Sequence, residues 1–313
     1  MPSILEYMQF ATGVYAASDK NILGDPTGWT LNAWQPDTAS GFSAGYYLNS
    51  QSNEVVISYT GTNDVVDPAN WASGMGLPMP QIFDAVAYYF FVKAAHPTAN
   101  ITFTGHSLGG GLASMMAVFF DKTAMVFDQA PFQPAAMSPL VLPFIGAQML
   151  IAGYQDEAFS TYLLSGGLLA LTRESNITHY YVEGEVLNAI RYSANTLVGS
   201  DNIISIENSS AGPVDRHSMA LMTALWKSPA FLVAAKRLPD LITQLLDTNL
   251  FATSPTDQNK EDLLRRLLRH QFGVEGGILP DDMLERFSAD MNKLAQDGGL
   301  TLSDGNLWNP ALN

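Results

Sequence analysis

One short segment, residues 101–111, constrains the fold more than any other part of the chain: it reads ITFTGHSLGGG. Residues 101–104 form a β-branched and aromatic run typical of a buried strand, and residues 108–120 read as a helix. Between them, Gly105-x-Ser107-x-Gly109 has the spacing of a nucleophile elbow, a sharp strand-to-helix turn that exposes a serine hydroxyl. The glycines allow neighbouring backbone to approach this turn. Because the strand and the helix are both present, we predict that Ser107 is a nucleophile.

A catalytic serine needs a general base, and the five histidines of the chain allow a choice by elimination. The order along the chain in this architecture is nucleophile, acid, histidine. Two histidines come too early for this order, one lies in a strand-like run, and one ends a helix among arginines: His96, His106, His179 and His270. His217 remains, in a turn-rich loop between a strand-like run at 203–206 and a predicted helix at 219–226. A loop is a typical place for a general base, so His217 is the predicted base.

The acid that would orient this histidine has several candidates. Glu185 is the first choice, because it follows a strand-like run at 177–182 and the turn at Gly184. Asp128, which follows a strand-like run at 124–127, is the main rival. The other carboxylates that stay open are Glu183, Asp201 and Asp215.

An oxyanion hole is predicted at the end of another strand. Residues 54–60 read as a buried strand, and Gly61 and Thr62 follow as a turn. Thr62 can offer a backbone N–H and a hydroxyl to one oxygen. The second donor would be the N–H of Leu108, the residue after the nucleophile.

These motifs together resemble the class 3 lipase family of α/β-hydrolases over roughly residues 40–225, and residues 105–110 are the strongest part of the match. The resemblance implies an α/β-hydrolase fold and an acyl-transfer site. The residues that would form this site are Thr62 for the oxyanion hole, Ser107 as nucleophile, Glu185 as acid and His217 as base. The chain departs from the family in having glutamate where aspartate is usual, and Tyr59-Thr60 where many members have Phe-Arg. The first departure keeps Asp128 open as the acid.

Composition excludes several classes of function. The net charge is −15, with 15 basic and 30 acidic residues, which argues against a nucleic-acid partner because phosphate binding needs clustered cations. The absence of cysteine excludes disulfides and thiol catalysis. No metal-ligand spacing is visible and the proposed chemistry needs no cofactor, so we expect neither a metal nor an organic cofactor.

Alternating strands and helices predict an α/β class with a mostly parallel central sheet. We expect an α/β-hydrolase domain at residues 1–228 and a helical C-terminal extension at 229–313. Within the domain, residues 129–172 carry only two charges, Asp156 and Glu157. This apolar insertion is predicted to be a cap or lid over the acyl-binding cleft. A helical hairpin that completes the core is the alternative.

The predicted activity is hydrolysis of lipid carboxylic esters through an acyl-enzyme, as in a triacylglycerol lipase or a phospholipase A. The alternatives are a hydrolase of small esters or thioesters, and a non-catalytic lipid-binding or membrane-active protein. The expected partners are a lipid or other ester substrate and, transiently, a lipid surface; the oligomeric state is not indicated. The N-terminal residues lack a basic signal-peptide region. We therefore expect secretion without a cleaved N-terminal signal, or a cytoplasmic location.

Overall fold

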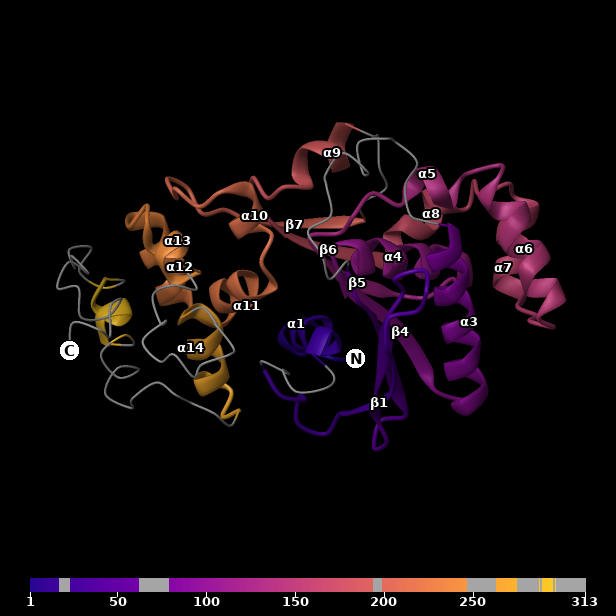
Figure 1. Cartoon of the computed structure of the whole chain (residues 1–313), viewed down its shortest axis with the longest axis horizontal. Helices are drawn as coiled ribbons and strands as arrows, with labels where there is room; N and C mark the ends of the chain where they lie inside the picture. Colours follow the sequence, from indigo (N-terminus) through magenta and orange to yellow (C-terminus); the bar gives the residue numbers. More distant parts are fainter. Residues whose placement is uncertain are drawn as a thin grey trace. The chain divides into compact units, whose positions relative to one another are not determined.

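A computed structural model gives the fold (Figure 1) and describes residues 1–16, 23–61, 79–193, 199–246, 263–274, 287, 289–294 and 296. Its centre is a seven-stranded sheet with the order β1-β2-β3-β4-β5-β6-β7. The chain divides into two compact units. The first unit consists of Met1–Asn21, Asp25–Tyr181 and Leu187–Ile203, and the second of Ile22–Gly24, Val182–Val186 and Ile204–Asn313.

The sheet is antiparallel at one edge and parallel in its middle. Its strands are β1 (Thr30–Gln35), β2 (Ala44–Asn49), β3 (Glu54–Tyr59), β4 (Asn100–His106), β5 (Ala124–Phe127), β6 (Ile177–Val182) and β7 (Ser200–Ile204). The pairs β1–β2 and β2–β3 are antiparallel, whereas β3–β4, β4–β5 and β5–β6 are parallel. Strands β3 and β4 are almost entirely buried, as expected of parallel strands covered on both faces. Together with the strand-to-helix elbow at Ser107, this topology is an α/β-hydrolase fold.

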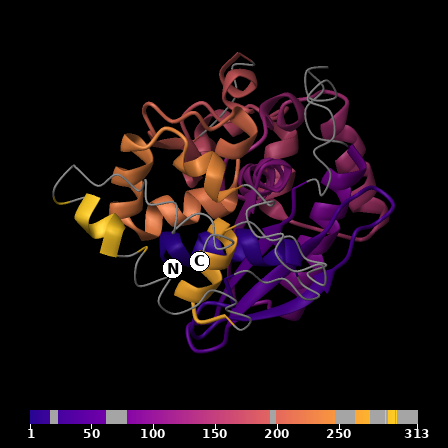
Figure 2. The same ribbon diagram turned by 60° about the vertical axis from the view of Figure 1, so that its left-hand side comes forward.

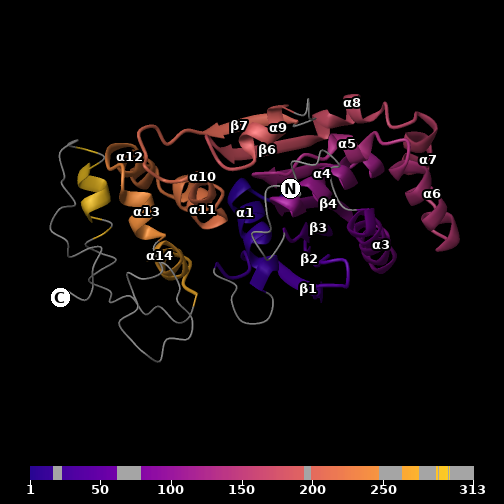
Figure 3. The same ribbon diagram turned by 45° about the horizontal axis from the view of Figure 1, so that its top comes forward.

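Helices cover both faces of this sheet. Helix α3 (Met79–Ala95) connects β3 to β4, and α4 (Leu108–Phe120) connects β4 to β5. Both lie on one face, and α1 (Ile4–Gly13) lies on the other, against β3, β4 and β5 (Figure 3). Helix α1 begins with a capping box, in which Ser3 and Glu6 each bond the backbone N–H of the other residue. It ends at Gly13 and continues as the short 3-10 helix η1 (Val14–Ala16). Helix α9 (Asn188–Ser193) lies between β6 and β7.

The apolar insertion between β5 and β6 forms four short helices rather than one long helix. They are α5 (Gln133–Ala136), α6 (Val141–Ile151), α7 (Glu157–Leu164) and α8 (Ala170–Arg173), followed by the 3-10 helix η2 (Glu174–Asn176). Helix α6 contacts α3, while α5, α7 and α8 contact α4, so one side of the insertion packs on the core helices. None of the described helices is long and apolar enough to cross a membrane. Motion of this insertion as a lid stays a prediction.

The second unit contains helices α10 (Pro213–Arg216), α11 (Met219–Lys227), α12 (Pro229–Arg237), α13 (Leu241–Leu245) and α14 (Leu263–Gln271), drawn in orange in Figure 2. Helix α11 contacts both α12 and α14. Helix α14 has a buried apolar stripe, which consists of Leu263, Leu264, Leu267 and Leu268. The predicted domain boundary after residue 228 lies within this unit and stays a prediction.

Candidate active site

Ser107 occupies a strained turn between β4 and α4. Its φ of 56° and ψ of −124° lie where residues other than glycine rarely occur, and such a conformation persists only when its surroundings hold it. Three backbone hydrogen bonds do so. The Ser107 N–H donates to the Phe127 carbonyl at 3.1 Å, and the Ser107 carbonyl accepts from the N–H groups of Gly111 at 3.1 Å and Ala130 at 2.9 Å. The elbow is therefore fixed to the end of β5 as well as to its own helix.

The glycines of the elbow are required by close backbone contacts. A Cβ on Gly105 would overlap the backbone of Gly109, and a Cβ on Gly109 would overlap the backbone of Tyr59 and Thr60. Helix α4 can therefore start against β3 and β4 only if both positions lack a side chain. This contact is the physical reason for the motif, and it agrees with the expectation from the sequence.

The predicted oxyanion donors lie beside the elbow along the chain. Leu108 is the first residue of α4 and is buried, so its N–H is one of the unpaired donors that a helix presents at its N-terminus. Thr62 lies outside the described residues. The residue before it, Gly61, packs against the nucleophile: a Cβ on Gly61 would lie 3.2 Å from the Cβ of Ser107. The end of β3 and the elbow are thus in direct contact.

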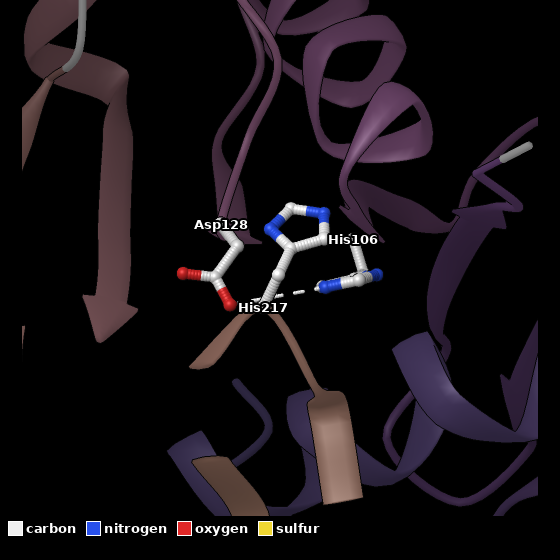
Figure 4. Close-up of side chains that lie close together, drawn as sticks. All are labelled: His106, Asp128 and His217. Atoms are coloured by element: carbon white, nitrogen blue, oxygen red, sulfur yellow. Dashed lines mark ion pairs between the residues drawn. The ribbon is translucent and has the colours of Figure 1, made fainter. Parts of the chain in front are cut away.

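In the first unit, a histidine and a buried carboxyl group lie next to the nucleophile. His106, immediately before Ser107, has its Nε2 atom 3.8 Å from Oδ2 of Asp128 (Figure 4). Asp128 is fully buried, follows β5 with a φ of 41°, and donates its N–H to the Tyr180 carbonyl at 2.9 Å. The Nδ1 atom of His106 is 3.3 Å from the hydroxyl of Tyr15, a residue that no sequence motif singled out.

In the second unit, a buried carboxylate holds the predicted base. The Nδ1 atom of His217 is 2.8 Å from Oε2 of Glu185, and Glu185 is only 3% exposed. A carboxylate accepts the Nδ1–H bond, which leaves Nε2 as the nitrogen able to take a proton. This arrangement is the one that a general base requires.

Arg216 stabilises the segments that carry Glu185 and His217, a role that sequence reasoning missed. Its Nη1 atom donates to the Glu183 carbonyl at 2.7 Å, and its Nε atom donates to the Ala211 carbonyl at 3.0 Å. The guanidinium thus ties the turn before Glu185 to the loop before His217. Gly184 adopts a φ of 78° in this turn, and a Cβ there would lie 3.1 Å from Arg216 Nη1.

Most of the other carboxylates and histidines considered from the sequence are exposed or have other hydrogen-bond partners. Glu183 is exposed. Asp201 Oδ1 is 3.0 Å from Nδ1 of His179, a buried residue of β6. Asp215 Oδ2 accepts the Gly212 N–H at 3.2 Å and caps α10. The remaining histidines are His96, which bonds the Tyr46 hydroxyl at 3.0 Å, and His270, near the end of α14.

Comparisons with known proteins give a family for this arrangement. A family model described as "Phospholipase-like: Tle-like phospholipase domain" matches residues 11–236. The extracellular phospholipase A1 of Serratia liquefaciens is 37% identical to the chain over 126 residues, which are 39% of this chain and 37% of that protein. The match therefore spans little more than a third of the relative's length.

Solved structures of fungal lipases show a weaker similarity. The lipase of Rhizopus microsporus var. chinensis is 14% identical, with a TM-score of 0.42 over 64% of this chain and 72% of that one. The triacylglycerol lipase of Penicillium expansum is 15% identical, with a TM-score of 0.39 over 66% of this chain and 79% of that one. Similarity of this size carries no information about the substrate.

Proposed function

Because the chain belongs to the phospholipase-like family, a family of lipid ester hydrolases, we propose that it cleaves the carboxylic esters of phospholipids. The observation that carries the proposal is the strained conformation of Ser107 at the start of α4, which serves to expose a nucleophile. The activity in the name of the Serratia relative supports a phospholipid over a triacylglycerol as the substrate.

This mechanism assigns one role to each of the predicted site residues. Ser107 is the nucleophile, His217 is the general base, and Glu185 holds His217 in the required tautomer. The Leu108 N–H and Thr62 bind the oxyanion. The 2.8 Å bond between Glu185 and His217 supports the choice of Glu185 over Asp128 as the acid.

The reaction proceeds in two acyl-transfer steps. Nε2 of His217 takes the Ser107 proton while the serine oxygen bonds to the ester carbonyl carbon, which forms a tetrahedral oxyanion. Nε2 then gives this proton to the leaving lysophospholipid alkoxide as the ester C–O bond breaks. Water attacks the resulting acyl-enzyme, its proton passes through Nε2 to Ser107, and a fatty acid is released. The chain's own side chains supply each of these proton transfers.

Turnover of defined esters by the Ser107→Ala variant tests this proposal. The substrates are a phosphatidylcholine vesicle, a triolein emulsion and chromogenic esters from C2 to C16. Loss of the hydroxyl should lower kcat by about 10⁴-fold or more. Ser175→Ala is the matched control, because Ser175 is exposed and bonds the Thr172 carbonyl; it should retain the activity.

The outcomes separate the alternatives. Phospholipid turnover that depends on Ser107 supports a phospholipase. Turnover limited to short soluble esters or thioesters would support a small-ester hydrolase instead. Vesicle binding by the wild type and Ser107→Ala without turnover by either would support a lipid-binding protein and refute the proposal.

We also propose that the apolar insertion contacts the lipid surface. Large apolar side chains stay exposed on it, and its carboxylate Asp156 is paired with Lys93 at 2.7 Å. The exposed side chains are Leu140, Phe144, Leu150, Ile151, Leu164, Leu168 and Leu171. An apolar surface with little charge is typical of a site that contacts a membrane or a protein.

Paired serine substitutions at Leu150 and Ile151, each 78% exposed, test this contact. They should weaken binding to phosphatidylcholine vesicles severalfold while kcat on a soluble short-chain ester stays unchanged. Ile203→Ser is the control, because Ile203 is 58% exposed and lies outside the insertion. Equal vesicle binding by all three proteins would refute the contact.

A location outside the cell agrees with the Serratia relative, whose name describes it as extracellular. We propose secretion over cytoplasmic residence for this reason. Fractionation of a culture that expresses the full chain tests it: the protein should accumulate in the medium while a cytoplasmic marker does not. Retention with the marker would favour the cytoplasm.

A further inference from the structure

The hydroxyl of Tyr15 lies between the end of β3 and the nucleophile elbow. The Gly61 N–H donates to Tyr15 Oη at 2.6 Å. The same oxygen is 3.3 Å from both the carbonyl oxygen and the Nδ1 atom of His106, the residue before Ser107. One side chain from η1 therefore joins two backbone segments that are distant in sequence.

The proton of this hydroxyl has a defined role in the network. Because Oη accepts the Gly61 N–H, its single proton is available to His106, either at the carbonyl or at Nδ1. Burial raises the pKa of Tyr15 above its ordinary value, so the hydroxyl stays neutral and keeps this proton. On its other side, His106 faces Asp128 across 3.8 Å. The imidazole is thus placed between Tyr15 and a buried carboxyl group.

Gly61 packs closely against Tyr15, His106 and Ser107. A Cβ on Gly61 would overlap Tyr15 Oη, and it would lie 3.0 Å from the His106 carbonyl oxygen and 3.2 Å from Ser107 Cβ. The hydroxyl therefore sets the separation between the end of β3 and the serine. A small change in this separation would alter the space beside Ser107 in which the oxyanion forms.

We propose that Tyr15 is a positioning residue for the acyl-transfer reaction, holding Gly61 and His106 at fixed places on either side of Ser107. This inference rests on the proposed function. The hydroxyl contacts Gly61 and His106, so in this proposal it acts through the backbone beside Ser107. Its loss should therefore affect kcat rather than KM.

Tyr15→Phe, which removes only the hydroxyl, tests the proposal. We expect kcat on a soluble ester to fall by about tenfold with KM within twofold of the wild type, a smaller loss than removal of a direct oxyanion donor causes. Tyr7→Phe is the matched control, because Tyr7 lies in α1 and its buried hydroxyl bonds Thr102 of β4 at 2.9 Å. This control should keep kcat within twofold, even where its thermal stability falls as much as that of Tyr15→Phe.

Binding of a transition-state analogue gives a readout that a structural role alone would not change. The inhibition constant of an alkyl boronic acid, which forms a tetrahedral adduct with the serine, should rise in Tyr15→Phe by the same factor as kcat falls. An unchanged kcat, or a kcat loss equal to that of Tyr7→Phe, would overturn the proposal. The wild type and Ser107→Ala are measured in parallel. Absence of wild-type turnover would refute the proposed function itself, which distinguishes the two failures.

A double-mutant cycle with Gly61→Ala tests whether the hydroxyl acts through Gly61. The added methyl overlaps Tyr15 Oη, so Gly61→Ala should lower kcat less in the Tyr15→Phe background than in the wild type. Strictly additive losses in kcat would show that the two residues act independently and would overturn the inference.

Discussion

Replacement of Glu185 by glutamine removes the charge that faces His217 while keeping the shape of the side chain. In the proposed mechanism His217 becomes an imidazolium in the transition state, and the carboxylate 2.8 Å from its Nδ1 atom stabilises this charge. The glutamine amide has no charge, and its NH₂ group can face Nδ1 and favour the wrong tautomer. The variant should therefore fold normally and lose catalytic rate.

The separation in the structure sets the size of the effect. With an effective dielectric constant of about 20, two unit charges at the 2.8 Å distance between Oε2 and Nδ1 interact by about 6 kcal/mol. Each 1.36 kcal/mol of barrier changes a rate tenfold, so the loss of this interaction corresponds to about a 10⁴-fold lower kcat. The Glu185 side chain is buried and that of His217 is 15% exposed, so solvent screens the pair only weakly.

The assay is steady-state hydrolysis of a short soluble ester, which removes any contribution from lipid binding. Asp128→Asn is the matched control, because Asp128 is also a buried carboxyl group and was the rival acid from the sequence. Its Oδ2 atom is 3.8 Å from Nε2 of His106, a longer separation than the 2.8 Å between Glu185 and His217, so Asp128→Asn should lower kcat much less than Glu185→Gln does. Circular dichroism of both variants checks that each is folded.

The opposite pattern would refute this reasoning. If Asp128→Asn lost about four orders of magnitude in kcat and Glu185→Gln less than one, Asp128 would be the acid of the catalytic site. The bond between Glu185 and His217 would then have a structural role only.

Two further predictions concern the scaffold that holds the elbow. Gly109→Ala places a methyl group against the Tyr59 backbone and should destabilise the protein by about 3 kcal/mol in thermal unfolding, because the backbone of a central strand cannot move aside. Gly212→Ala, where the added carbon meets only an ordinary contact at 3.6 Å, should be tolerated; an equal loss in both variants would contradict the argument. Arg173→Met should cost about 3 kcal/mol, because the buried guanidinium donates to two carbonyls at the end of α4 at 2.7 and 3.0 Å. Lys122→Met is its control and should stay within about 0.5 kcal/mol of the wild type in the same unfolding measurement.

Local patterns predicted the central elements closely, because their signals lie within a few neighbouring residues. Strands β5 and β6 have the bounds expected from the apolar runs at 124–127 and 177–182. Helix α4 begins at Leu108, as the motif requires. The bounds of β7 were predicted less well: the apolar run suggested residues 203–206, and the strand covers Ser200–Ile204. The strand includes polar residues, since pairing with a neighbouring strand rather than hydropathy decides where an edge strand begins.

The sequence by itself identified the candidate groups of an acyl-transfer site: a serine in an elbow, one histidine in a late loop, and a short set of carboxylates. It ranked Glu185 first but left the other carboxylates open, because Glu185 and His217 are 32 positions apart and only the tertiary fold brings their atoms to 2.8 Å. Nor could it identify Tyr15, whose partner His106 is 91 positions away. Hydropathy marked the insertion as apolar, whereas packing on α3 and α4 decided which of its side chains are buried. Local geometry and composition are encoded by neighbouring residues, but contacts between distant residues exist only when the whole chain is folded.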